Sequence, residues 1–209
     1  FFIDQCEVTV GQLRTFVEAT GAVLKFKESS RHFSTPASNN LPAAEVTWEE
    51  AQRYAQWAGK ALPTEAQWEK AARGTDGRLY PWGNTPPTAA HGHFGPAFQQ
   101  TALYVAVGQF PQGASPYGCL DLLGNQYEWT AEKNWPYPGN PDADKMKDYA
   151  GTCVVLRGGS WYHGKVGFYA AKRFGFRPDE TYYHVGFRTV WVPPPGYFES
   201  QAFVQARLP

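Results

Sequence analysis

The sequence predicts an α+β domain in which the helices come first and a loop-rich half with short strands follows. Two capping boxes, TWEE at 47–50 and TEAQ at 64–67, each open a stretch with a helical apolar period that ends at a glycine. From Tyr80 onward no helical period is convincing, and turn pairs such as Gly158-Gly159 are dense. Helices segregated from strands in this way favour α+β over a doubly wound sheet.

Each element has its own local signal. Three short helices are expected after the caps Thr9, Thr47 and Thr64, and Gly21, Gly59 and Gly74 end them. Their inward positions are Leu13, Phe16 and Val17, then Trp48, Ala51, Ala55 and Ala58, then Trp68, Ala71 and Ala72. Short β-prone runs predict strands at 127–130, 153–157 and 185–190. Residues 1–192 are expected to form one domain, with 193–209 as a C-terminal extension opened by three prolines.

Composition excludes several classes of function. The 209 residues carry 19 Lys+Arg and 19 Asp+Glu, so a nucleic-acid partner is not expected. No apolar run reaches the roughly 18 residues that span a membrane, so no membrane insertion is expected. Three cysteines without CxxC spacing make neither a disulfide scaffold nor a zinc knuckle. The aromatic content, 8 Trp, 12 Tyr and 14 Phe, is what needs an explanation.

Seven ordered motifs resemble those of the formylglycine-generating-enzyme (sulfatase-modifying-factor) family, from Phe1 to about Val190. The resemblance implies a C-type-lectin-like fold, which agrees with a loop-rich chain. The motifs are FID with EVT at 2–9, VTW at 46–48, LPTEAQWE at 62–69, YPWGN at 80–84, LGN with EWT at 123–130, RGGSW at 157–161 and GFR at 186–188.

The catalytic cysteines of that family have no match. In the oxidase they follow the RGGS-type motif, hold copper and perform thiol chemistry. Here 160–168 reads SWYHGKVGF, with His163 and Phe168 near those places and no cysteine after Cys153. A thiolate mechanism then lacks its nucleophile, so copper is not expected. The missing cysteines favour a non-catalytic role for the chain. A further branch makes sulfoxides with iron held in a separate helical domain, for which this sequence has no match.

A calcium loop is the metal site that the resemblance implies. Its counterpart is 121–128, DLLGNQYE, where two carboxylates flank a Gly-Asn turn, and Ca²⁺ prefers a mixture of carboxylate and carbonyl oxygens. The family's ligand set carries over as Asp121 and Glu128 through side chains, with Leu122, Gly124 and Gln126 through carbonyls. Such an ion would be structural. The alternative is that both acids make loop hydrogen bonds.

The segment His91-Gly92-His93 could resemble a pair of transition-metal ligands. No third ligand lies nearby in the sequence, so a solvated loop is predicted instead.

Aromatic residues are densest between Trp161 and His184. Poor alternation there indicates exposed rings on loops or short strands, which is typical of a binding surface. The segment resembles the variable region of diversity-generating-retroelement proteins, in which RGGSW opens and GFR closes a region randomised at Asn AAC codons. The blocks 162–164, 174–176 and 182–184 hold only residue types that such randomisation permits. The predicted ligand-binding residues are Tyr162, His163, Gly164, Val166, Phe168, Phe174, Phe176, Tyr182, Tyr183 and His184.

The sequence therefore predicts a non-catalytic binding module whose aromatic face takes a protein or another macromolecule. Two alternatives stay open. One is a family enzyme with altered chemistry, oxidase-like or sulfoxide-synthase-like, using His163 and His184. The other is a sensor domain of a larger protein. A third reading gives the rings of 161–184 no role beyond the ordinary core of the fold.

Overall fold

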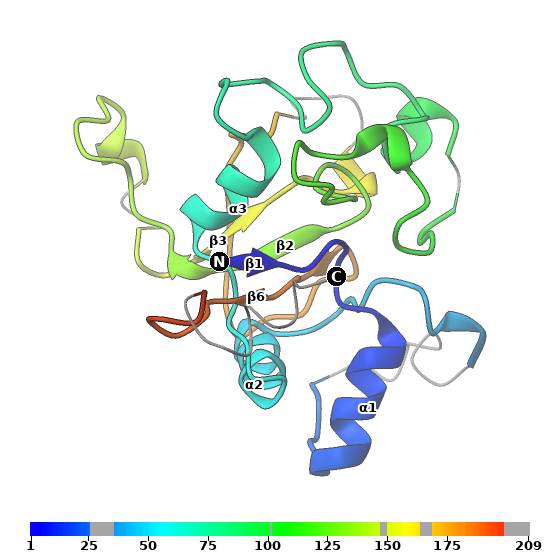
Figure 1. Cartoon of the computed structure of the whole chain (residues 1–209). Coiled ribbons are helices and arrows are strands. Elements are labelled where there is room, and N and C mark those ends of the chain that lie inside the picture. The colour runs from blue at the N-terminus through cyan, green and yellow to red at the C-terminus, as the bar shows by residue number, and fades with distance from the viewer. Residues whose placement is uncertain (26–35, 101, 147–149, 164–168, 199–209) are drawn as a thin grey trace.

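A computed structural model describes residues 1–25, 36–100, 102–146, 150–163 and 169–198. Three α-helices and six short strands are joined by long loops that carry single 3₁₀ turns (Figure 1). The elements in order are β1 (Phe2–Ile3), α1 (Val10–Thr20), η1 (Pro36–Ser38), α2 (Trp48–Trp57), α3 (Glu65–Arg73), η2 (Gly95–Phe98), η3 (Pro111–Gly113), β2 (Tyr127–Lys133), η4 (Ala143–Met146), β3 (Val154–Arg157), η5 (Trp161–His163), β4 (Phe174–Phe176), β5 (Val185–Gly186) and β6 (Val190–Trp191). The predicted α+β class, loop-rich with three helices and short strands, is confirmed.

All three helices begin at the predicted caps. Thr9, Thr47 and Thr64 each accept a hydrogen bond from the third helical N–H, and the side chain of that third residue bonds back to the cap. These reciprocal bonds satisfy two N–H groups that a helix start otherwise leaves open. Gly21 ends α1 in the left-handed conformation, with φ 65°. Local sequence alone is therefore enough to place the helices.

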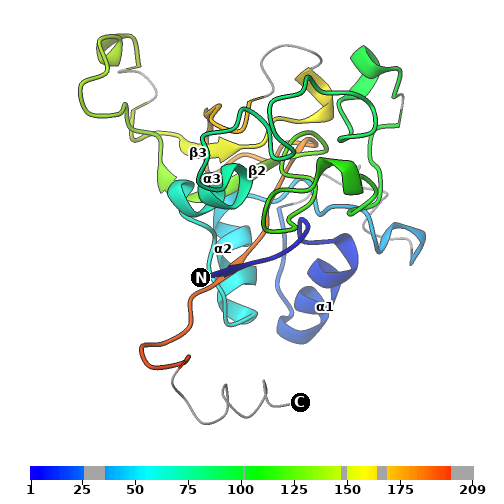
Figure 2. The same cartoon turned by 45° about the horizontal axis from the view of Figure 1, so that its top comes forward.

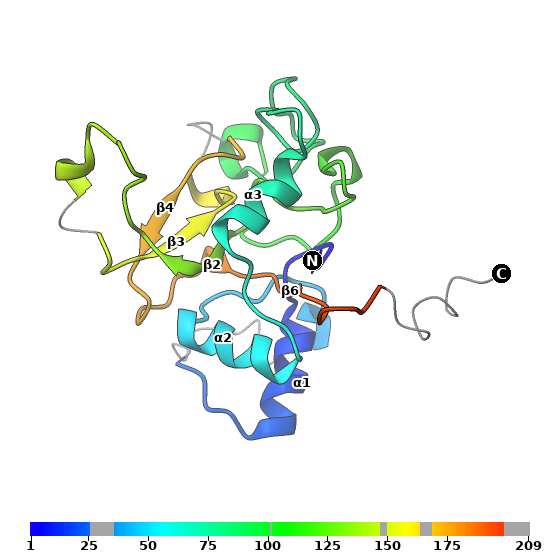
Figure 3. The ribbon, with the colours of Figure 1, turned by 60° about the vertical axis from the view of Figure 1, so that its left-hand side comes forward.

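The main sheet has the order β4-β3-β2-β5. Figure 3 shows β4, β3 and β2 side by side. β2 pairs antiparallel with β3, and β5 lies parallel to β2 with Glu128 opposite Gly186. A second, two-stranded ribbon joins β1 to β6 and so brings the start of the chain beside residue 191. Strands β1 and β4 were not expected from the sequence. The predicted run 185–190 divides into β5 and β6, because the chain leaves the main sheet after Gly186 to pair with β1.

The helices lie on opposite sides of the strands. α1 and α2 are on one side and α3 is on the other (Figures 1 and 3). Because side chains alternate along a strand, Tyr127 and Trp129 of β2 join the core against α1 and α2, whereas Glu128 reaches Trp68 of α3. The loops of residues 90–100 and 102–125 gather on the same side of the molecule as η5 (Figure 2). No helix among the described residues is long and apolar enough to cross a membrane.

Candidate ligand-binding face and its charged support

The three predicted aromatic blocks meet at His184. This residue precedes β5, and its carbonyl accepts the backbone N–H of Tyr127 at 3.0 Å, which fixes it to the sheet. Its ring centroid lies 5.1 Å from Tyr162, nearly parallel, and 5.7 Å from Phe176, nearly perpendicular. Tyr183 packs edge-on at 4.9 Å. Segments more than twenty residues apart thus form one cluster of rings.

Two rings of this cluster face solvent. Tyr162 is 54% exposed and Tyr183 is 40% exposed, and their centroids lie 5.5 Å apart at 89°. Burial, followed by the hydrogen bond and charge of Tyr162, raises the pKa of the Tyr183 hydroxyl. Both side chains offer a rigid apolar ring with a polar tip, the combination that suits a contact surface. We call Tyr162, Tyr183 and the ring of His184 beneath them the aromatic face.

Two further residues, Trp161 and Tyr104, contact the aromatic face from the interior of the protein. Trp161 is buried, and its ring contacts Tyr162 at 6.0 Å and Tyr183 at 5.8 Å. Tyr104 donates its hydroxyl to the carbonyl of Tyr183 at 2.8 Å and packs edge-on against Trp161. Sequence reasoning missed Tyr104, which lies in a loop far from the aromatic segment and belongs to no motif. Only the fold brings it there.

The other predicted residues divide into supports and undescribed positions. Phe174, Phe176 and Tyr182 are half-buried and pack on the main core, so the expectation of exposed rings is wrong for them. The reason is that β4 pairs with β3 and lays its phenylalanines against Tyr127 and Tyr182. The His163 backbone lies in η5. Gly164, Val166 and Phe168 lie outside the described residues.

Arg188 of the GFR motif is a buried cation at the centre of the fold. Its Nε and Nη2 donate to the two oxygens of Glu128, both at 2.7 Å. The remaining N–H groups reach three backbone carbonyls, at 2.8 to 3.1 Å, of Asp4, Gln5 and Leu120. Every guanidinium donor is satisfied, and the group ties the first residues of the chain to β2. The Glu128 charge is the largest favourable influence on the pKa of Arg188, which stays raised despite burial.

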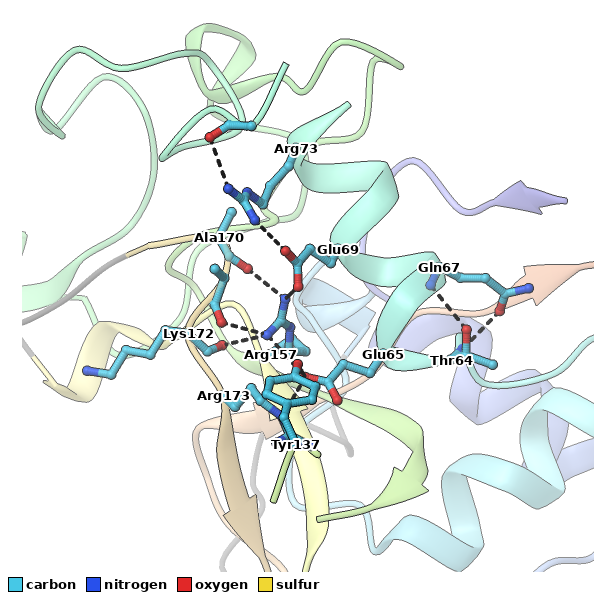
Figure 4. Close-up of polar contacts among 12 residues, drawn as sticks. Thr64, Glu65, Gln67, Glu69, Arg73, Tyr137, Arg157, Ala170, Lys172 and Arg173 are labelled. Carbon is cyan, nitrogen blue, oxygen red and sulfur yellow. Dashed lines mark hydrogen bonds and ion pairs between the residues drawn. The ribbon is translucent and has the colours of Figure 1, made fainter. Parts of the chain in front are cut away.

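Arg157 of the RGGSW motif makes a second such centre on the α3 side (Figure 4). Its guanidinium pairs with Glu69 at 2.7 Å and with Glu65 at 3.3 Å, and lies 5.3 Å from the ring of Trp68. It also donates to the carbonyls of Ala170, Ala171 and Lys172. Residues 170–172 are therefore anchored to the scaffold.

The predicted calcium ligands do not all fit this geometry. Both oxygens of Glu128 are taken by Arg188, and Oε2 also accepts the indole N–H of Trp68 at 2.8 Å, so Glu128 does not face an ion. The carbonyls of Leu122 and Gln126 do converge, since a methyl group added to Gly158 would meet them at 3.0 and 3.6 Å. Among the residues that the structure describes, no three His, Cys, Asp or Glu side chains are grouped to hold a metal. Calcium itself stays a prediction.

Burial affects two of the three thiols, Cys6 and Cys119, and one histidine of the pair, His93. Burial, and then the charge of Asp121, raise the pKa of the half-exposed Cys6 to about 11, and burial also raises the pKa of Cys119. A protonated thiol is a weak nucleophile. His93 was expected in a solvated loop, and this is wrong: it is 1% exposed, and its Nε2 lies 2.8 Å from the Ala102 carbonyl.

Comparison with known proteins agrees with this scaffold. The model of the sulfatase-modifying factor enzyme 1-like domain matches residues 1–193. The hercynine oxygenase of Mycobacterium tuberculosis is 40% identical over 129 residues, which cover 57% of this chain and 29% of that protein. The formylglycine-generating enzyme of Thermomonospora curvata is 34% identical over 206 residues, covering 90% of this chain and 67% of that protein.

Solved structures share the fold. PvdO from Pseudomonas aeruginosa has a TM-score of 0.71 at 24% identity, covering 90% of this chain and 78% of that one. Treponema denticola variable protein 1 has a TM-score of 0.62 at 18% identity, covering 90% and 82%. The molecule is thus a lectin-like domain built around buried arginines. The chain belongs to the sulfatase-modifying factor enzyme 1-like family, and it spans under a third of the hercynine oxygenase that it matches.

Proposed function

We propose that this chain is a non-catalytic ligand-binding module, and that it is a variable protein of the diversity-generating-retroelement kind. The observation that carries the proposal is the aromatic face: Tyr162 and Tyr183 stand exposed over His184 on a rigid scaffold. Exposed tyrosines held by packing lose little entropy on binding and offer large contact area. The expected ligand is a protein or another macromolecule.

The scaffold supports this role by holding the face rigid. Tyr162 follows β3 and Arg157, whereas Tyr183 and His184 lie between β4 and β5. The exposed side chains of Tyr162 and Tyr183 can therefore change while the buried arginine pairs stay the same. The likeness in fold to a Treponema denticola variable protein is consistent with such use. Zero net charge suits recognition by shape and aromatic contact.

The gene itself gives the sharpest test. Codons for 162–164, 174–176 and 182–184 should mostly end in C, a nearly identical template repeat should lie beside a reverse transcriptase, and sequenced populations should vary at these codons. Positions that support the fold, such as Arg157, Glu128 and Arg188, should not vary. Codons that mostly end otherwise, or substitutions spread evenly over the chain, would contradict diversification.

A second candidate is an enzyme with altered chemistry, favoured by the 40% identity to a hercynine oxygenase. In that role His184 would lie close to the reacting groups. The test is metal content by mass spectrometry of the purified protein, together with oxygen consumption in the presence of hercynine. Stoichiometric iron or copper with turnover would favour the enzyme over the binding module.

A further inference from the structure

A hollow of about 520 Å³ lies between helix α3 and the end of strand β2. We call it the α3 hollow. Its lining includes charged side chains from both walls and one tyrosine: Glu65, Lys70, Glu132, Lys133, Tyr137 and Arg173. The volume falls within the range of roughly 300–1,000 Å³ that is typical of small-molecule sites. None of the described residues that form the aromatic face lines the α3 hollow, so it is a separate site.

The carboxylates on the α3 wall are already neutralised. Glu65 and Glu69 are shared by three guanidinium groups, those of Arg73, Arg157 and Arg173. Figure 4 shows these five side chains gathered along α3. Three cations therefore meet two carboxylates, and the group carries one positive charge in excess.

Two lysines add to this excess. Lys70 of α3 and Lys133 of β2 are exposed, and neither forms an ion pair with another residue that the structure describes. The remaining acid of the lining is Glu132, which accepts the Glu65 N–H at 2.7 Å, and burial is the main cause that raises its pKa. Because lysine carries its charge on a flexible stem, both ammonium groups can turn into the α3 hollow. The hollow therefore favours an anion.

Tyr137 gives the α3 hollow an exposed ring in a fixed orientation. Its hydroxyl donates to Glu65 Oε1 at 2.8 Å, and the Arg173 guanidinium lies 4.2 Å from its ring centroid. Arg173 is itself held by Glu65 and by the Trp135 carbonyl, at 2.9 Å. The tyrosine side chain is nevertheless 53% exposed. A cation against one face of the ring disfavours a second cation on the other face and suits an electron-rich or anionic ring.

We propose that the α3 hollow binds a small organic anion that carries a planar ring. Its anionic group pairs with Lys133 and Lys70, and its ring stacks on the open face of Tyr137. An ammonium group pairs with a carboxylate or a phosphate alike, so both belong to the ligand class. Stacking of the ring adds to the contribution of the ion pairs. This site does not depend on the proposed function, because it shares no residue with the aromatic face.

The experiment is titration calorimetry of the full chain with four probes. AMP and benzoate each combine a ring with an anionic group, whereas adenosine has only the ring and inorganic phosphate has only the charge. AMP or benzoate should bind at one site with a Kd at least about tenfold below that of either single-feature probe. Added salt should weaken this binding, since the lysines are exposed. Binding of AMP alone would identify phosphate as the anionic group, and binding of benzoate alone would identify carboxylate.

Variants then place the binding in the α3 hollow. Lys133→Gln and Tyr137→Leu should each weaken it about tenfold, whereas Tyr137→Phe keeps the ring and should retain most of it. The matched control Lys145→Gln makes the same charge change in η4, at a side chain that is 79% exposed, and should leave binding unchanged. Tyr162→Ala should also leave it unchanged, so a failure of the aromatic face and a failure of the α3 hollow are distinguishable.

Three results would overturn the proposal. The first is that neither AMP nor benzoate binds. The second is that adenosine or phosphate binds as tightly as they do, which would show that ring and charge do not act together. The third is that Lys145→Gln loses as much affinity as Lys133→Gln, which would show nonspecific attraction to surface charge. Equal urea midpoints for all variants confirm that the comparison is made on folded protein.

Discussion

Arg188 and Glu128 form a two-bond ion pair that no solvent reaches: both side chains are 0% exposed and both N–O distances are 2.7 Å. They are 60 positions apart in the chain, and the indole of Trp68 gives the same carboxylate a third donor. Strand β2, helix α3 and the first residues of the chain therefore share one charged centre. The aromatic face depends on this centre, because β2 also holds the backbone of His184.

Removing one member of the pair should be costly. Arg188→Met leaves Glu128 buried without a counter-charge and should lower the free energy of unfolding by about 3–5 kcal/mol. The double variant Arg188→Met/Glu128→Gln should recover part of that loss, since the stranded charge is gone. Urea unfolding followed by tryptophan fluorescence measures both. A loss below about 1 kcal/mol for the single variant would show that the pair contributes little.

Gly95 should tolerate no side chain. Its φ is 73°, and an added Cβ would lie 1.9 Å from the Trp161 carbonyl, directly behind Tyr162. Gly95→Ala should therefore lower the free energy of unfolding by about 2–4 kcal/mol. Gly77 has a similar φ of 70° with open space around it, so Gly77→Ala isolates the backbone cost of about 1–2 kcal/mol. Equal losses in the two variants would mean that the contact with η5 is loose.

His93 should make the fold sensitive to mild acid. Burial is the main cause that lowers its pKa below 6.5, so the unfolded chain binds a proton that the folded chain rejects. Stability is then fully present above the unfolded pKa and falls as the pH drops below it, with a slope of at most about 1.4 kcal/mol per pH unit. In His93→Gln the slope between pH 5 and 7 should be shallower by this contribution. Parallel curves for variant and wild type would refute the assignment.

Sequence reasoning succeeds here where the signal is local. Capping boxes lie within four residues, so Thr9, Thr47 and Thr64 predict their helices without tertiary context. Strand β4 carries no such signal, because Phe174-Gly175-Phe176 is a strand only through its pairing with β3. The same pairing half-buries two rings that composition suggested were exposed.

The sequence predicted which segments form the candidate site, but it did not predict how their side chains are arranged or how far each is exposed. The three aromatic blocks do come together around His184, as their clustering indicated. The exposed fraction of each ring depends on residues that are distant in the sequence. One of these is Tyr104, whose hydroxyl donates to the carbonyl of Tyr183. The family resemblance predicts Glu128 as a calcium ligand, whereas in the structure Arg188 neutralises this carboxylate. The sequence pattern of a carboxylate after a turn is the same in both cases.

The most direct test of the central claim is binding at the aromatic face. A phage-displayed random peptide library is panned on the immobilised protein, and selected peptides are titrated against the wild type, Tyr162→Ala, Tyr183→Ala and Tyr117→Ala. Tyr117 is 55% exposed and borders a separate hollow with Phe1 and Lys70, so it is the control. We predict that both face variants keep the wild-type urea midpoint and weaken binding at least tenfold, about 1.4 kcal/mol, whereas the control is unchanged. Peptides that bind both face variants as tightly as the wild type would contradict the claim.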